Sequence, residues 1–118
     1  MQERRIFMAR NRIFEPVIFT LLRTDGNNHA DDIEFKVSYG YELKNYEHPV
    51  FKVQMVGAGY IKGRQAPTYS DDDFDKIIQI RNILKEKFYN YSPEIRVNLR
   101  DIEVSMSEIE QTIQINNQ

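Results

Sequence analysis

Apolar and polar residues alternate most regularly between Ile33 and Leu43. Six apolar side chains occupy every second position, namely Ile33, Phe35, Val37, Tyr39, Tyr41 and Leu43. The positions between them carry Glu34, Lys36, Ser38, Gly40, Glu42 and Lys44. A period of two predicts a β-strand with one buried face and one face in water.

The next segment repeats this alternation over a shorter length. Phe51, Val53 and Met55 alternate with Lys52 and Gln54. The residues at 45–49 form a short polar stretch that ends in a proline, so the two strands are predicted to be antiparallel neighbours. The second strand ends in the glycine-containing stretch 57–60, which indicates a kinked strand end, with a ligand contact as the alternative.

Upstream, the stretch 12–22 is mostly apolar and β-branched, and Glu15-Pro16 interrupts it. This pattern predicts two short strands or one bent strand, with Pro16 at an edge or a bend. A polar turn at 25–28 follows. Together with the hairpin, these segments predict a sheet of about four strands.

A helix is predicted from Ser70 to Tyr89. Ser70 can cap its start, and Asp73 three residues later completes a pattern that resembles a capping box. The run Asp71-Asp72-Asp73 suits the positive end of the helix dipole, with a metal site as the less favoured alternative. One side of the helix is predicted to cover the apolar face of the sheet, through Phe74, Ile77, Ile78, Leu84 and Phe88.

Ser92-Pro93 ends this helix, and the alternation of Ile95, Val97 and Leu99 predicts a short extended segment after it. A second amphipathic helix is predicted from the helical spacing of Ile102, Met106, Ile109 and Ile113. The expected fold class is α+β: an antiparallel sheet of about four strands with helices packed on one face. Residues 1–118 are expected to form a single domain.

Composition narrows the possible partners. The 118 residues carry a formal net charge of -2, which argues against a nucleic-acid-binding protein. Arg4, Arg5, Arg10 and Arg12 form a local exception, interpreted as a frayed end, with a phosphate-binding arm as the alternative. No apolar run is long enough for a membrane span and no signal peptide is recognisable, so the expected location is the cytoplasm.

Residues for catalysis or metal binding are sparse. The chain has no cysteine, and its two histidines, His29 and His48, lie in predicted loops without a partner at helical spacing. No carboxylate pair or nucleophile–base pair is marked by its surroundings. We therefore expect no enzyme activity, no metal and no cofactor. Seven tyrosines and seven phenylalanines favour a binding surface instead.

The stretch from Ala30-Asp31-Asp32-Ile33 to Tyr60-Ile61 resembles the central hairpin of the SecB export-chaperone family. The shared features are an acidic pair, a long alternating strand, a short turn, a strand that begins with Phe51 and a glycine-containing end. The stretches 5–7 and 13–16 are similar to the first strand of that family. The resemblance implies a four-stranded antiparallel sheet, a tetramer and an ATP-independent holdase that keeps client proteins unfolded.

The chain also departs from that family. Glu15 matches an acidic position through which the family docks on its export motor, but Asn11 and Gln54 stand neutral at the other matching positions. The zinc-binding tail of the family has no counterpart. A SecB-like chaperone with a different client, for example one that guards an antitoxin or serves a phage or mobile element, is therefore the better hypothesis, with Glu15 and Gln54 as its candidate docking residues.

The sequence thus predicts a protein that binds unfolded or extended polypeptide. The candidate client-binding residues are Tyr39, Tyr41, Phe51, Met55 and Tyr60. Ile109 and Ile113 are the candidate subunit contacts of a homotetramer. The alternative is a small interaction protein, of phage or immunity type, that blocks one specific folded partner.

Overall fold

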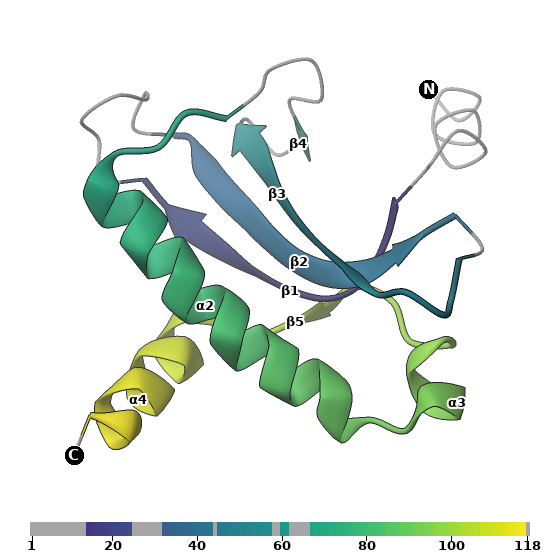
Figure 1. Cartoon of the computed structure of the whole chain (residues 1–118). Coiled ribbons are helices and arrows are strands. Elements are labelled where there is room, and N and C mark those ends of the chain that lie inside the picture. Colours follow the sequence, from purple (N-terminus) through teal and green to yellow (C-terminus); the bar gives the residue numbers. More distant parts are fainter. Residues whose placement is uncertain (1–13, 25–31, 44, 58–59, 62–66, 118) are drawn as a thin grey trace.

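A computed structural model describes residues 14–24, 32–43, 45–57, 60–61 and 67–117. Strands β1 (Phe14–Arg23), β2 (Glu34–Glu42) and β3 (Val50–Gly57) form an antiparallel meander. The two-residue strands β4 (Tyr60–Ile61) and β5 (Ile102–Glu103) extend it to the order β4-β3-β2-β1-β5. β5 runs parallel to β1 and the other neighbours are antiparallel. The predicted α+β class is therefore confirmed (Figure 1).

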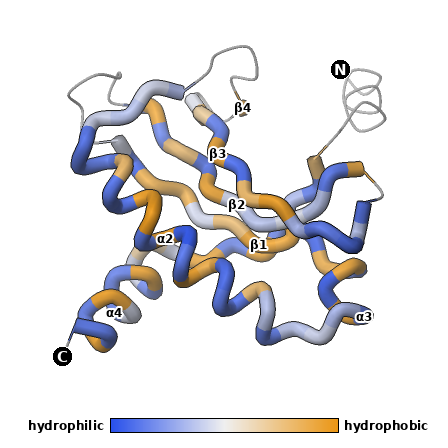
Figure 2. The backbone as a smooth tube through the Cα atoms, in the orientation of Figure 1, coloured by the Kyte–Doolittle hydropathy of each residue, from blue (hydrophilic) through white to orange (hydrophobic). Residues whose placement is uncertain are grey.

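The described helices are α2 (Asp71–Asn90), the short α3 (Pro93–Arg96) and α4 (Met106–Asn116). α2 lies diagonally across β1 and β2, and α4 packs against both α2 and β1 (Figure 1). Figure 2 shows hydrophobic stretches along the strands and along α2, and the buried residues of these elements form one core cluster. The face of the sheet that carries α2 is called the inner face below, and the opposite face is called the outer face.

The alternation along β2 places its side chains as predicted. Phe35 and Val37 are fully buried on the inner face, and Glu34 and Lys36 point to the outer face. β3 is in matching register, with Phe35 opposite Met55 and Val37 opposite Val53. Ile33 and Met55 are buried as well, whereas Phe51 and Val53 are only half-buried because β3 lies beyond the edge of α2.

Of the two alternatives for the first segment, the structure has one bent strand. The register of β1 against β2 shifts between Pro16 and Ile18, so Val17 is the extra residue of a bulge. Gly40 lies opposite this irregularity, where the backbone of Glu15 and Pro16 approaches it closely. The absence of a side chain at Gly40 allows that approach.

The predicted cap of α2 is confirmed, since the Ser70 hydroxyl accepts a hydrogen bond from the Asp73 backbone N–H at 3.1 Å. Its core side is formed by Ile77, Ile80, Leu84 and Phe88. Phe74 and Ile78 were predicted on this side, but they are 48% and 37% exposed. Ile78 follows Ile77 by one position, which turns it about 100° around the helix and away from the sheet.

The prediction of an extended segment at 95–99 was wrong. Pro93 begins the short helix α3, because proline at the first helical position lacks only an N–H that would have no partner there. The extended piece lies later, at β5. The last helix also begins later than predicted, at Met106, where Ser105 accepts a hydrogen bond from the Glu108 backbone N–H at 3.2 Å.

Several predictions concern residues outside the described part of the chain: the N-terminal arginines, the turn at 25–28, His29 and the glycine of the second strand end at position 59. In the described part, His48 is exposed in the turn between β2 and β3. None of the described helices is both long enough and apolar enough to cross a membrane.

Candidate binding surface

Helix α2 has one flank that another helix covers. Lys87 of α2 forms an ion pair with Glu108 of α4, with 2.8 Å between Nζ and Oε2. Ile109 of α4 is fully buried in the same core cluster as Ile80 and Ile83. α4 also contacts β1, so it lies on the side of α2 that faces the β1–β5 end of the sheet (Figure 1).

The opposite flank of α2 carries a row of side chains spaced by four, three, four and four residues. Because residues three or four apart in a helix share one face, these side chains lie in a single line. The row is called the α2 flank below and consists of Phe74, Ile78, Arg81, Lys85 and Tyr89. Phe74, Ile78 and Tyr89 are among the exposed large hydrophobic residues of the described chain.

Sheet order determines what lies beside this flank. α4 covers the flank on the β1 side, so the α2 flank faces the side of β3 (Figure 1). Tyr69, just before the helix, joins the two regions: its ring lies 5.2 Å from Phe35 and 5.6 Å from Phe74. Burial raises the pKa of the Tyr69 hydroxyl above its ordinary value, so this aromatic bridge is uncharged at neutral pH.

β3 presents a long edge beside the α2 flank. On one edge of β3, β2 pairs along Val50 to Val56, whereas on the other edge β4 pairs only with Val56 and Gly57. Within the described residues, the stretch 50–55 has no strand partner on this second edge. Phe51 and Val53 are half-buried on the inner face of this stretch, and the ring of Phe51 lies 5.7 Å from that of Tyr39. The half-buried side chains of Phe51 and Val53 thus lie along an unpaired strand edge. Together with Phe74 and Ile78 of the α2 flank, which faces the same side of the sheet, they are called the apolar strip below.

The candidate client-binding residues separate into two groups. Tyr39, Tyr41 and Met55 are 6%, 1% and 5% exposed, so they belong to the core and present almost no surface to a client. Their position on the inner face explains this, because α2 and α3 cover that face. The Tyr39 ring packs against Phe88, and the Tyr41 hydroxyl accepts a hydrogen bond from Arg96 Nε at 3.3 Å.

The other two candidates lie on the β3 side of the sheet. Phe51 is half-exposed and belongs to the apolar strip. Tyr60 is in β4, paired with Gly57, but the structure does not describe its side chain. Of the five predicted residues, Phe51 is therefore the one that the structure places at this surface with a described side chain.

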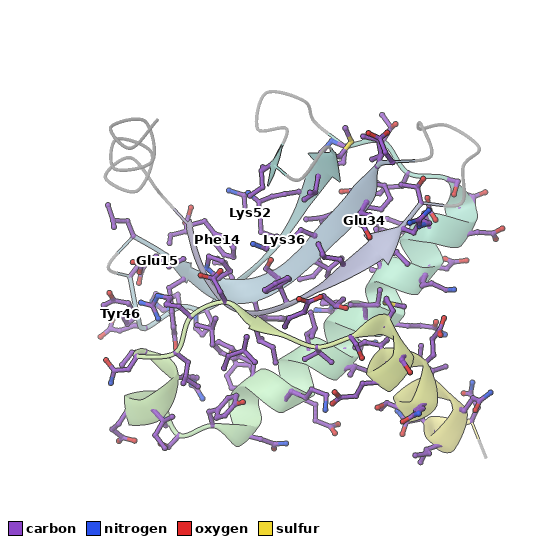
Figure 3. The ribbon with its side chains drawn as sticks, turned by 180° about the vertical axis from the view of Figure 1, so that it is seen from behind. Phe14, Glu15, Glu34, Lys36, Tyr46 and Lys52 are labelled. Atoms are coloured by element: carbon purple, nitrogen blue, oxygen red, sulfur yellow. The ribbon has the colours of Figure 1, made fainter. Side chains whose placement is uncertain are left out.

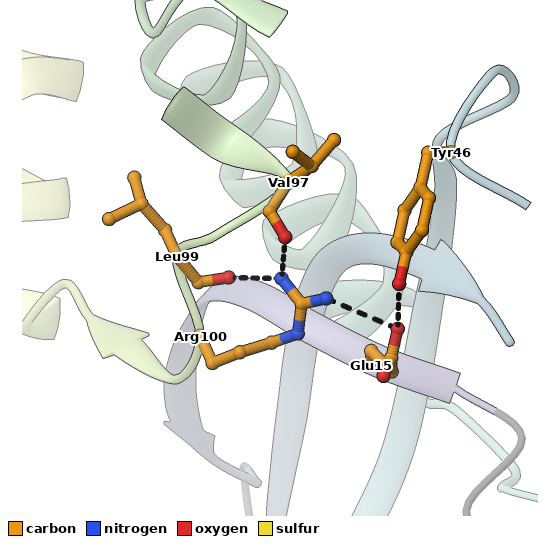
Figure 4. A network of polar contacts seen from close by, with 5 residues as sticks. All are labelled: Glu15, Tyr46, Val97, Leu99 and Arg100. Atoms are coloured by element: carbon orange, nitrogen blue, oxygen red, sulfur yellow. Dashed lines mark hydrogen bonds and ion pairs between the residues drawn. The ribbon is translucent and has the colours of Figure 1, made fainter. Parts of the chain in front are cut away.

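The candidate docking residues are not brought together. Glu15 lies on β1, where its Oε1 accepts hydrogen bonds from Arg100 Nη2 at 3.2 Å and from the Tyr46 hydroxyl at 3.5 Å (Figure 4). Its carboxylate is thus engaged within the chain. Gln54 lies on β3, half-buried on the outer face and opposite Lys36 of β2.

The candidate subunit contacts lie largely inside the molecule. Ile109 is 0% exposed, so it has no surface to offer to a second subunit. Ile113 is partly buried against the same core cluster. The helical spacing that suggested an assembly face therefore serves the contact of α4 with its own α2 and β1. On the same helix, Ile115 is the strongly exposed apolar side chain.

The outer face of the sheet carries a second arrangement, and none of the described helices lies on it (Figure 3). Lys36 Nζ lies 4.5 Å from the ring centre of Phe19, and Lys52 Nζ lies 5.2 Å from that of Phe14. These contacts place an ammonium group over each of two aromatic rings. Between them, Ser38 is fully buried, and its hydroxyl has no hydrogen-bond partner within the described structure.

Sequence reasoning missed the exposed role of Phe74 and Ile78 and the whole of the α2 flank. The signal was present in the helical spacing, because Ile77, Leu84 and Phe88 define a core line from which Phe74 and Ile78 deviate to one side. A cavity of about 500 Å³ at the start of α2, lined in part by Arg23, Asp72 and Lys76, was missed as well.

No group of three or more His, Cys, Asp or Glu side chains suited to a metal ion occurs among the described residues, so the three aspartates of α2 find no support as a metal site. What the described surface offers is the apolar strip, the two outer-face lysines Lys36 and Lys52, and an unpaired strand edge.

In comparisons with known proteins, no family model, no curated protein and no solved structure matches this chain.

Proposed function

We propose that this chain binds extended polypeptide along the edge of β3 and acts as an ATP-independent, SecB-like holdase that keeps clients unfolded. The observation that carries the proposal is the edge of β3 at 50–55, which has no strand partner among the described residues and carries the half-buried Phe51 and Val53 on its inner face. An unpaired edge offers backbone donors and acceptors to any extended chain, whatever its sequence.

Side chains of the bound segment supply the second part of the affinity. In an added strand, alternate side chains point to the inner face, where Phe51 and Val53 are half-buried. Phe74 and Ile78 of the α2 flank lie on the same side and are exposed. Burying apolar client side chains against these residues contributes roughly 25 cal/mol for each Å² removed from water.

Assembly into a homotetramer, in the cytoplasm, is part of the same proposal. Leu43, Ile61 and Ile95 are large apolar side chains that a single chain leaves exposed. Apolar surface of this kind favours association, which would also line up several β3 edges for one long client.

The test combines light scattering, which gives the mass, with suppression of the aggregation of an unfolded model protein. Ile78→Asp is expected to weaken suppression because it places a charge in the apolar strip. Ile115→Asp is the matched control, since it makes the same change at an exposed site on α4. Equal suppression by both variants, or no suppression by the wild-type chain, would overturn the proposal.

The outer face supports one alternative, a protein that blocks a specific folded partner. Lys36 and Lys52, each placed over an aromatic ring, form a compact patch on a stiff sheet, which suits a folded surface better than an extended chain. Lys52→Glu distinguishes the two functions, because it alters the outer face and leaves the α2 flank unchanged. If Lys52→Glu no longer binds a folded partner protein while Ile78→Asp still binds it fully, the alternative is favoured.

A further inference from the structure

The α2 flank is not apolar along its whole length. Its first part, Phe74 and Ile78, is apolar, and it is followed by Arg81 and Lys85. Lys85 is exposed and Arg81 is half-buried. A surface for apolar segments alone would not need two adjacent cations beside its apolar strip.

Arg81 carries an unused hydrogen-bond donor. Its Nη2 donates to Asn82 Oδ1 at 3.0 Å, but its Nε is buried and has no acceptor within the described structure. A buried donor without an acceptor is unfavourable, and a guanidinium is best satisfied by a carboxylate, which accepts two of its N–H groups at once. Because the Nε atom itself is buried, an acidic ligand on the flank would contact the outer Nη groups of the guanidinium instead.

The charge along α2 also changes from acidic at the start of the helix to basic further on. The first turn is acidic, with Asp71, Asp72 and Asp73, and the basic pair follows about two turns later. An acidic ligand group would be repelled at the start of the helix and attracted at Arg81 and Lys85. The apolar part of the flank lies between these two charged regions.

From these observations we infer that the segment bound at the β3 edge carries a carboxylate beside two apolar residues. Read from one of its two ends, the bound segment has the alternating pattern apolar-x-apolar-x-acidic. The inference rests on the proposed function and names its substrate class. Phe74 and Ile78 contact the apolar side chains, and Arg81 and Lys85 contact the carboxylate.

The spacing along the two elements is compatible with this pattern. Phe74 and Ile78 are separated by about 6 Å along the helix axis, and the basic pair lies on average about 7–8 Å further on. Side chains on one face of a strand recur every 6.5–7 Å or so. The repeat of same-face side chains along an added strand thus matches the spacing of the two apolar positions and the basic pair along α2.

The experiment uses the full chain and three fluorescent peptides of about ten residues, a length typical of long strands. They share the alternating apolar pattern and carry Glu, Gln or Lys at the third same-face position. Fluorescence anisotropy is expected to give about three- to tenfold tighter binding of the Glu peptide than of the Gln peptide, with the Lys peptide weakest. About 1 M salt should remove most of this difference.

Arg81→Gln is expected to abolish the preference for Glu over Gln while the Gln peptide still binds. Lys76→Gln, on a different side of α2 from the flank, is the matched control and should keep the preference. If Arg81→Gln does not fold, Lys85→Gln replaces it, since Lys85 is exposed. Equal affinity of the wild-type chain for the Glu and Gln peptides overturns this inference alone, whereas failure to bind any of the three overturns the proposed function as well.

Discussion

Arg100 Nη2 donates a hydrogen bond to Glu15 Oε1 at 3.2 Å, across 85 positions of the chain (Figure 4). The same guanidinium donates from Nη1 to the backbone carbonyls of Val97 and Leu99, at 2.8 and 2.6 Å. One side chain thus holds the segment after α3 in a tight turn and ties it to the start of β1. Next to this tie, backbone hydrogen bonds from Asp101 N–H to Pro16 O at 3.0 Å and from Val104 N–H to Phe19 O at 2.8 Å hold β5 beside β1.

Arg100→Met should therefore destabilise the fold by about 1–3 kcal/mol, a value reduced by the partial exposure of both side chains. The variant removes the hydrogen bonds to two carbonyls and one of the two hydrogen bonds to the Glu15 carboxylate. Urea unfolding measures the change. The exposed Arg23 provides the control, and Arg23→Met should cost clearly less; equal losses in the two variants would contradict the role of the tie.

Phe35→Ala should lower the free energy of unfolding by about 3–5 kcal/mol, because Phe35 is fully buried between the sheet and α2. Phe74→Ala removes the same ring from an exposed position and should change stability by less than about 1 kcal/mol. Thermal and urea melts compare the two. A larger loss for Phe74 than for Phe35 would show that the assignment of core and surface is wrong.

Gly40→Ala should destabilise the protein by about 1–3 kcal/mol or more, because the new Cβ would meet the backbone of Glu15 and Pro16, which cannot move aside as a flexible side chain can. Ser38→Ala, two positions earlier on the same strand, is the comparison. It removes a buried hydroxyl without a described partner, so it should be neutral or slightly stabilising. A stable Gly40→Ala protein would contradict the close approach of β1.

Ile109→Ala should cost about 2–5 kcal/mol of stability, because Ile109 is fully buried where α4 packs against α2 and β1. Its mass in solution should be unchanged as long as it stays folded. The strongly exposed Ile115 is the control, and Ile115→Ala should leave stability within about 0.5 kcal/mol of the wild type. Full stability of Ile109→Ala together with a lower mass would restore Ile109 as a subunit contact.

EDTA and added zinc should each leave the melting temperature unchanged. The chain has no cysteine, and the described residues contain no cluster of His, Asp or Glu suited to a metal. A ligand that binds only the folded state raises the melting temperature. A shift of several degrees with either reagent, seen by differential scanning fluorimetry, would contradict the prediction.

Local rules made much of the fold predictable. The period of two in β2 and β3 and the Ser70 cap are properties of a few adjacent residues, and the structure has them as predicted. β5 has only two residues, too few for a pattern, and its position depends on contacts with the distant β1. Contacts of that kind leave no periodic signal in the sequence.

The candidate surface was less predictable than the fold. Tyr39 and Tyr41 were assigned to it because tyrosine is amphipathic, but their strand face lies under α2 and α3. Whether a tyrosine faces a core or a client depends on which helix covers its strand. Likewise, the described elements leave the α2 flank uncovered because α4 packs on the other side of the helix, and that side is determined by the packing of elements far apart in the sequence.

The position of β5 also bears on the order in which the protein is made. β1 leaves the ribosome 85 residues before Arg100 does, as the spacing of the tie shows. The meander is complete only after Gly57, which precedes Arg100 by 43 residues. At translation rates of 5–20 residues per second, these 43 residues take roughly 2–9 s, whereas a β-hairpin forms within about 10 μs. The β1–β2–β3 meander can therefore form while its β1 edge is still open, and a nascent chain in this state is open to strand pairing with neighbouring nascent chains.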